Sequence, residues 1–191
     1  MAKRSGASKS FTVFAIVMAL ALVLGSLFVF GGAIFGSEPD DPLDEREEAN
    51  RLIADLETQV AENPDDADSA ANLANIYANQ GNIAGAIPLY ERATSQRPED
   101  GNLRLSFGIA LYRGGSTLDA QVQLERALEL LPENASPAYY LGQLEQLRDE
   151  PDVEAARIWY ERAIETDPES LVAEQARERL DELGASATPT P

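Results

Sequence analysis

The sequence lacks several side chains on which much protein chemistry depends. It contains no cysteine and no histidine, which excludes disulfides, thiolate nucleophiles, imidazole acid–base catalysis and metal sites built from thiolate or imidazole. It also contains no phosphate-binding glycine loop with its lysine and no Gly-x-Ser-x-Gly nucleophile motif. We therefore expect a protein that is not an enzyme, with no cofactor, no metal and no small-molecule substrate.

Positive charge is scarce as well. Lysine occurs only at Lys3 and Lys9, and all 33 acidic residues lie from Glu38 onward, where 12 arginines leave a net charge of −21 (12 − 33). A nucleic-acid-binding surface needs clustered positive charge to meet the phosphates. The sequence therefore predicts no nucleic-acid partner.

Charged residues are absent between Lys9 and Glu38, where the apolar run FTVFAIVMALALVLGSLFVFGGAIF stands. A spanning helix needs about 20 apolar residues, so we predict a transmembrane signal-anchor helix over 11–36. The basic residues of 1–10 place the N-terminus in the cytoplasm and the rest of the chain in the periplasm or outside the cell. A cleaved signal peptide is the alternative, but its apolar region is usually about 7–15 residues long and small residues precede the cleavage site, where this run has Phe35.

One sequence motif occurs three times in similar form: YERATSQRPED, LERALELLPEN and YERAIETDPES. The prolines in these motifs, together with Pro64 upstream, are spaced by 34, 34 and 36 residues. A period of this length indicates stacked helical hairpins, because one unit cannot bury its own apolar face and neighbouring copies share a core.

Each motif stands at the end of a predicted amphipathic helix. Gly81 and Gly115 are suited to the tight turns before two of these helices, and Asn82, Ser116 and Asp152 are the predicted N-caps. Steps of four and three residues place one triplet of every helix on a single face. The triplets are Ala86, Tyr90, Ala93; Ala120, Leu124, Ala127; and Ala156, Tyr160, Ala163.

This pattern resembles the tetratricopeptide repeat (TPR) family, which has small residues at the eighth, twentieth and twenty-seventh positions, a large one at the twenty-fourth and proline at the thirty-second. The resemblance covers residues 67–168 and implies an all-α solenoid of three helix-turn-helix repeats with flanking capping helices. The sequence departs from the family at the fourth position, where Ala70, Arg104 and Ala138 stand. The third unit has two extra residues, which we place in 148–152, and Glu145 at its eleventh position, where the family has an aromatic residue.

The predicted organisation follows from these assignments. It comprises a cytoplasmic N-terminus (1–10), the transmembrane helix (11–36), a linker (37–44), an N-terminal capping helix (45–63), three TPR units (67–100, 101–134 and 135–170), a C-terminal capping helix (171–183) and a disordered tail (184–191).

The resemblance further implies that the first helix of each unit lines a concave groove that binds a partner. Asn and Gln amides there can pair with a peptide backbone, tyrosines offer large contact areas, and Leu and Ile form an apolar floor. The alternative is that the asparagines only solvate an exposed face and that the arginine pairs with a neighbouring acid. The predicted groove residues are Asn72, Asn75, Asn79, Leu105, Ile109, Tyr112, Arg113, Tyr139 and Gln143.

These features together predict a membrane-anchored TPR scaffold that binds a peptide or helix of a partner protein. The layout of one membrane helix followed by repeats is similar to that of the accessory factors of cytochrome c maturation, which present the apocytochrome for haem ligation. Two alternatives remain at the sequence level: an ancillary subunit of the secretion translocon, which has the same layout, and an envelope protein that self-associates and has no client.

Overall fold

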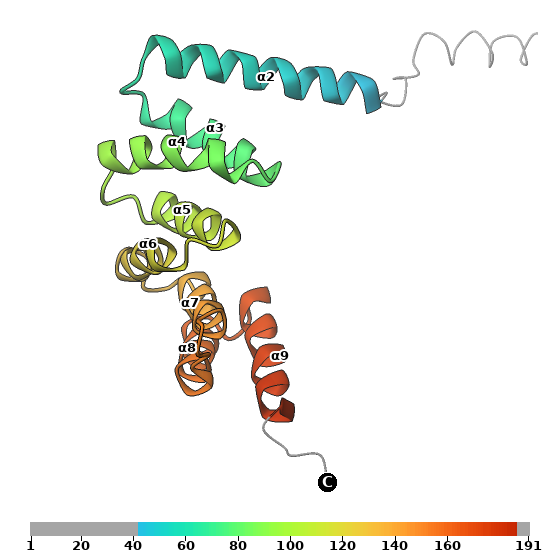
Figure 1. Ribbon diagram of the computed structural model, residues 1–191, viewed down its shortest axis with the longest axis vertical. Coiled ribbons are helices and arrows are strands. Elements are labelled where there is room, and N and C mark those ends of the chain that lie inside the picture. Colours follow the sequence, from blue (N-terminus) through green and yellow to red (C-terminus); the bar gives the residue numbers. More distant parts are fainter. Residues whose placement is uncertain (1–41, 187–191) are drawn as a thin grey trace, which may run out of the picture. The chain divides into compact units, whose positions relative to one another are not determined.

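The computed structural model describes residues 42–186, and every regular element in this range is an α-helix (Figure 1). The all-α prediction is therefore confirmed for this part of the chain. The predicted membrane helix over 11–36 and the residues before it lie outside the described residues, as does the tail from 187 onward. Within 42–186, no helix has the length and apolarity needed to cross a bilayer. The helices are α2 (Pro42–Glu62), α3 (Ala67–Asn79), α4 (Ile83–Gln96), α5 (Gly101–Arg113), α6 (Thr117–Leu130), α7 (Ser136–Gln146), α8 (Val153–Thr166) and α9 (Leu171–Ser186).

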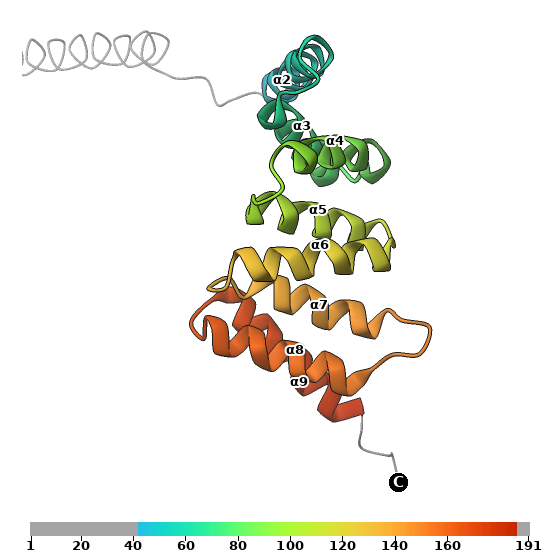
Figure 2. The same ribbon diagram turned by 90° about the vertical axis from the view of Figure 1, so that its left-hand side faces the viewer.

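Residues 50–186 form one compact unit of stacked helical hairpins. Helices α3 and α4, α5 and α6, and α7 and α8 pack as pairs, and α9 packs on α8 (Figure 2). Each first helix also contacts the next first helix, up to α7 with α9, whereas no second helix in the described chain contacts the following second helix. The first helices are therefore closer together, which places them on the inner, concave side of the stack.

The connections between paired helices explain two of the predicted turn residues. Gly81 and Gly115 both have φ of +79°, a left-handed conformation that glycine adopts without steric cost. The side chain of Asn82 accepts a hydrogen bond from the backbone N–H of Gly85 and caps α4. Ser116 stands at the predicted N-cap position of α6, but its side chain makes no capping hydrogen bond.

The core confirms the predicted register of the repeats. Tyr90, Leu124 and Tyr160 are at most 1% exposed. A Cβ atom added to Gly108 would lie 2.7 Å from Cγ of Leu124, which shows how closely α5 and α6 approach. The small residues of the three triplets are fully buried: Ala86, Ala93, Ala120, Ala127, Ala156 and Ala163.

Three element boundaries refine the predicted organisation. Helix α2 begins at Pro42, so residues 42–44 of the expected linker are helical; proline suits the first helical turn because its missing N–H would have no partner there. Helix α9 runs to Ser186, beyond the predicted end at 183. The connection between α7 and α8 spans 147–152, which is where the two extra residues were predicted.

Helix α2 packs on the first repeat as the predicted N-terminal cap. Its residues Leu56 and Val60 are buried in the same cluster as the cores of the first two repeats. The hydroxyl of Tyr77 on α3 donates a hydrogen bond to Oε1 of Glu57 on α2. These contacts cover the apolar side of the first repeat, which would otherwise face solvent.

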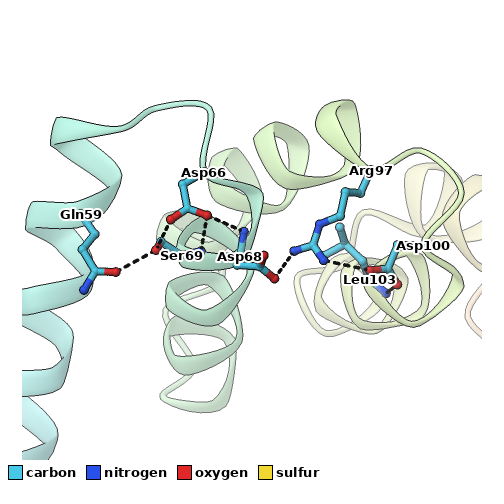
Figure 3. Close-up of polar contacts among 7 residues, drawn as sticks. All are labelled: Gln59, Asp66, Asp68, Ser69, Arg97, Asp100 and Leu103. Atoms are coloured by element: carbon cyan, nitrogen blue, oxygen red, sulfur yellow. Dashed lines mark hydrogen bonds and ion pairs between the residues drawn. The ribbon is translucent and has the colours of Figure 1, made fainter.

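A polar network joins the N-terminal ends of α3 and α5 (Figure 3). The carboxylate of Asp66 caps α3 by accepting from the backbone N–H of Asp68 at 3.0 Å and from Oγ of Ser69 at 2.7 Å; these bonds lower the pKa of Asp66, that with the Ser69 side chain most. Arg97, which follows α4, pairs with Asp68 and reaches Asp100, the N-cap of α5, at 3.5 Å. The network thus fixes one repeat against the next on the side where the first helices begin.

Candidate partner-binding groove

The inner side of the stack presents the side chains of the first helices α3, α5 and α7, which form the candidate groove. The structure distributes the predicted groove residues over three classes of exposure. Asn72, Asn79 and Arg113 are exposed; Asn75, Leu105, Ile109, Tyr112 and Gln143 are half-buried; and Tyr139 is buried. The groove therefore combines exposed amides and a cation with an apolar floor.

Asn75 is not free to bind a partner with both ends of its amide. Its Oδ1 accepts a hydrogen bond of 2.7 Å from the hydroxyl of Tyr90, the buried tyrosine of α4. This bond satisfies the one polar atom of a side chain that is otherwise enclosed in the core. It also leaves the Nδ2 donors of Asn75 as the groups that a bound chain can use.

The bond between Asn75 and Tyr90 leads to a prediction on stability. Asn75→Ala leaves the Tyr90 hydroxyl buried without its acceptor and is expected to lower the free energy of unfolding by about 1–3 kcal/mol. Tyr90→Phe removes the other partner, and the double variant is expected to lose less than the sum of the two single losses. Urea unfolding of the four proteins measures this coupling; Asn79→Ala, at an exposed position on the same helix, is the control and should change stability by less than about 0.5 kcal/mol. Additive losses would contradict the structural role of Asn75.

A cluster of four tyrosines lies between α5, α7 and α8. The rings of Tyr112 and Tyr140 have centroids 5.6 Å apart, those of Tyr139 and Tyr140 are 5.4 Å apart, and those of Tyr139 and Tyr160 are 5.7 Å apart. The edge-to-face and tilted geometries are favourable for aromatic rings. Tyr112 and Tyr140 are half-buried and can contact a bound chain, whereas Tyr139 is 7% exposed and packs in the interior of the cluster. Tyr139 therefore exposes little surface to a partner.

Helix α9 contributes a groove residue that the sequence reasoning did not include. Arg179 falls at the repeat position of Asn75, Ile109 and Gln143, because α9 takes the place of the first helix of a further repeat. Its Nη1 donates a hydrogen bond to Oε2 of Glu182. The interaction with the Tyr139 side chain and then that with Glu182 raise the pKa of Arg179. The signal in the sequence was the continuation of the repeat register past Pro168.

Arg113 is the groove cation that remains available. It lies at the C-terminal end of α5 and is exposed, and within 42–186 it makes no ion pair. Burial raises the pKa of Tyr90 to about 12, and the positive charge of Arg113 acts in the opposite direction by lowering that pKa. By contrast, Asp68 at the other end of the groove is engaged by Arg97. The groove can therefore attract a carboxylate near Arg113.

The raised tyrosine pKa values predict how the fold responds to alkali. Burial raises the pKa of Tyr90 to about 12 and also raises that of Tyr160, from an ordinary value of 10.0. Their stabilising contribution is therefore present below about pH 10 and is lost as the pH rises toward 12. In an alkaline titration, tyrosinate absorbance from these two residues should appear together with loss of helical circular dichroism. Tyr90→Phe should make stability less dependent on pH in this window; ionisation of all tyrosines near pH 10 in the folded protein would contradict the prediction.

The outer side of the stack holds a hollow of about 560 Å³ between α4, α5 and α6. Polar side chains on its walls satisfy one another or the backbone: Nη1 of Arg104 donates to Oε1 of Gln123 at 2.7 Å, and the hydroxyl of Thr94 donates to the carbonyl of Tyr90 at 2.8 Å. The first of these bonds joins α5 to α6 and the second lies within α4. The polar side chains of the hollow are thus engaged in the fold, so we assign it a structural role. No group of acidic side chains in 42–186 is arranged to hold a metal ion.

Comparison with known proteins identifies the repeats. Two tetratricopeptide repeat profiles match residues 46–105 and 105–170, and the helical pairs described above have the architecture that these profiles predict. The matched part of the chain therefore belongs to the tetratricopeptide repeat family. A comparison with curated proteins gives no match.

Several solved structures are similar to the chain in fold. The first TPR domain of Spaghetti (RPAP3), solved with the HSP90 peptide SRMEEVD, is 21% identical, with a TM-score of 0.56 over 63% of this chain and 91% of that one. YrrB, described as a TPR protein with an unusual peptide-binding site, is 20% identical, with a TM-score of 0.61 over 70% and 68%. MamA from Desulfovibrio magneticus is 18% identical, with a TM-score of 0.59 over 76% and 90%. At these identities the similarity shows the fold.

Proposed function

We propose that the chain is a scaffold that binds a peptide or helical segment of a partner protein along the groove of α3, α5 and α7. The observation that carries the proposal is the composition of these first helices: Asn72 and Asn79 on α3 and Arg113 on α5 are exposed, and α5 also carries the half-buried apolar side chains of Leu105 and Ile109. Exposed asparagines contribute little to helix stability, so their concentration here is explained better by binding than by folding. Two of the structural neighbours are described with peptide ligands or a peptide-binding site.

The chemistry of the groove defines what it should bind. Amide donors and acceptors can pair with the backbone of an extended chain whatever its sequence. The tyrosines Tyr112 and Tyr140 favour an apolar or aromatic side chain at the centre, and Arg113 favours a carboxylate beside it. We therefore expect a segment with an apolar side chain next to an acidic one.

Site-specific photo-crosslinking tests this proposal. A photoreactive residue at Asn72 in the groove should capture a partner in native extracts, whereas the same residue at Glu125, which is exposed on the outer helix α6, should not. The captured segment is then mapped, synthesised and titrated against the whole chain. The triple variant of Asn72, Asn79 and Arg113 to alanine should weaken binding by about tenfold or more and leave the melting temperature unchanged. Equal affinity for the variant and the original chain would reject the groove as the binding site.

The proposal extends to a membrane location through the apolar run at 11–36. A single helix there would tether the scaffold to the cytoplasmic membrane with the repeats outside the cytoplasm. Protease added to spheroplasts should then degrade the repeats while the N-terminal residues stay protected. Fractionation of the chain with soluble proteins would contradict the tether.

The resemblance of the layout to the accessory factors of cytochrome c maturation makes an apocytochrome segment the first client to test. A client of the secretion translocon and self-association are the alternatives. Identification of the captured segment separates the first two, and light scattering of the purified chain detects the third. A stable oligomer that buries Asn72 and Ile109 would favour a structural role over client binding.

A further inference from the structure

A group of exposed apolar side chains lies away from the groove, where α6 begins and α7 ends. Leu118 is 78% exposed, Val122 is 60% exposed and Leu147 is 53% exposed; we call these three residues the apolar patch. Leu118 and Val122 are one helical turn apart on α6 and therefore share a face. Leu118 and Leu147 line the same hollow of about 720 Å³, which joins the residues of the two elements into one surface.

The patch results from the extra residues of the third repeat. The connection 147–152 is longer than those between the other paired helices, as Figure 2 shows at the turn between α7 and α8. Leu147 stands at its start, and Arg148, Asp149 and Glu150 complete the wall of the hollow. The third repeat thus presents a surface that the first two do not have.

A polar anchor holds this connection in place. Glu145 is buried at the repeat position where Tyr77 and Leu111 stand in the other units. Its carboxylate accepts from Nε of Arg148 at 2.8 Å and from Nη2 of the same residue at 3.0 Å. This bidentate arrangement fixes the orientation of the two side chains. The backbone N–H of Asp152 donates to the carbonyl of Glu145 at 3.1 Å. The exposure of Leu147 is therefore a fixed feature of the structure.

The charge around the patch is negative. Asp149 and Glu150 line the hollow beside Leu118 and Leu147, and within 42–186 these two carboxylates make no ion pair. The nearby Arg148 is already paired with Glu145. A partner therefore meets apolar side chains bordered by uncompensated carboxylates.

From this arrangement we propose that the apolar patch is a second protein-binding surface that takes a basic amphipathic helix of a partner. Apolar side chains of that helix cover Leu118, Val122 and Leu147, and its lysines or arginines meet Asp149 and Glu150. A second copy of the chain fits less well, because two acidic borders would face each other. An anionic membrane surface is repelled by the same carboxylates.

Fluorescence anisotropy with a labelled synthetic peptide, LKKLLKLLKKLLKL, tests this proposal on the full chain. The comparison peptide has the same residues in an order without a helical apolar face. The amphipathic peptide is expected to bind more tightly than the comparison peptide, and Leu118→Asn with Leu147→Asn should weaken its binding by about tenfold. Asp149→Asn with Glu150→Gln should weaken it and reduce its dependence on salt. Because all four side chains are exposed, circular dichroism should show these variants folded.

Matched controls separate this surface from the groove. Leu171→Asn changes a leucine that is 69% exposed at the start of α9 and should leave the affinity unchanged, as should the alanine triple variant of the groove. Equal affinity of the patch variant and the original chain would overturn the proposal, as would equal affinity for the two peptides. Binding to vesicles of phosphatidylglycerol, or a dimer that Leu118→Asn dissociates, would replace it with a membrane or a self-association surface.

Discussion

Replacement of Ala93 by arginine is expected to unfold the repeats. Ala93 has no exposed surface and lies in the cluster that joins the cores of the first two repeats. A guanidinium there has no carboxylate partner and no room, so its burial should lower the free energy of unfolding by more than about 4 kcal/mol. A typical domain has a free energy of unfolding of about 5–15 kcal/mol in total, so a large part of that stability would be lost.

The measurement for this variant is far-ultraviolet circular dichroism with urea unfolding of the whole chain. Ser95→Arg is the matched control, because Ser95 is exposed on the same helix, two residues further along. The control should unfold within about 0.5 kcal/mol of the original chain. A fully helical Ala93→Arg protein with unchanged stability would contradict the assigned packing of α4.

Replacement of Tyr160 by alanine is expected to disorganise the C-terminal part of the solenoid. Tyr160 is fully buried; its ring packs against Tyr139 and over Gly142, and its hydroxyl hydrogen-bonds with Nε2 of Gln146. The loss of a buried aromatic ring to alanine lowers stability by about 3–5 kcal/mol. Because α9 packs on α8 and α7, it should lose part of its docking surface as well.

Hydrogen exchange followed by mass spectrometry locates this effect. In Tyr160→Ala, amide protection should fall first in α8 and α9 and remain higher in α3 and α4, since repeat proteins are stabilised mainly by neighbouring units. Tyr160→Phe keeps the ring and should lose only about 1 kcal/mol. Uniform loss of protection throughout the repeats would show that the solenoid unfolds as one unit.

The period of the prolines and the alanine triplets were sufficient to predict the helical hairpins. These signals are local: the side-chain size at fixed steps along a helix decides how closely two helices approach, and Gly81 and Gly115 allow the left-handed turns between them. The same register, continued past Pro168, would have placed Arg179 in the groove. A prediction of α9 as a capping helix alone leaves Arg179 out, because it does not extend the groove positions to a further unit.

Other features depend on contacts between residues distant in sequence and could not be predicted from periodicity. The repeat pattern predicts that Asn75 lies on the inner face. Its hydrogen bond with Tyr90 depends on how far α3 is shifted along its axis relative to α4, which the pattern does not specify. The repeat position of Tyr139 predicts a groove residue, whereas its packing against the rings of Tyr140 and Tyr160 depends on contacts that periodicity does not show. Glu145 was recognised as a departure from the family, whereas its pairing with Arg148 is visible only in the structure.

Nuclear magnetic resonance can show whether a partner segment binds along α3, α5 and α7. On addition of the segment captured from the groove, we expect the amide signals of α3, α5 and α7 to shift, with those around Asn79, Ile109 and Tyr112 shifting most. Signals of the outer helices α4, α6 and α8 should change little. Shifts confined to the outer helices, with the signals of Asn79 and Ile109 unchanged, would contradict a groove that binds a partner chain.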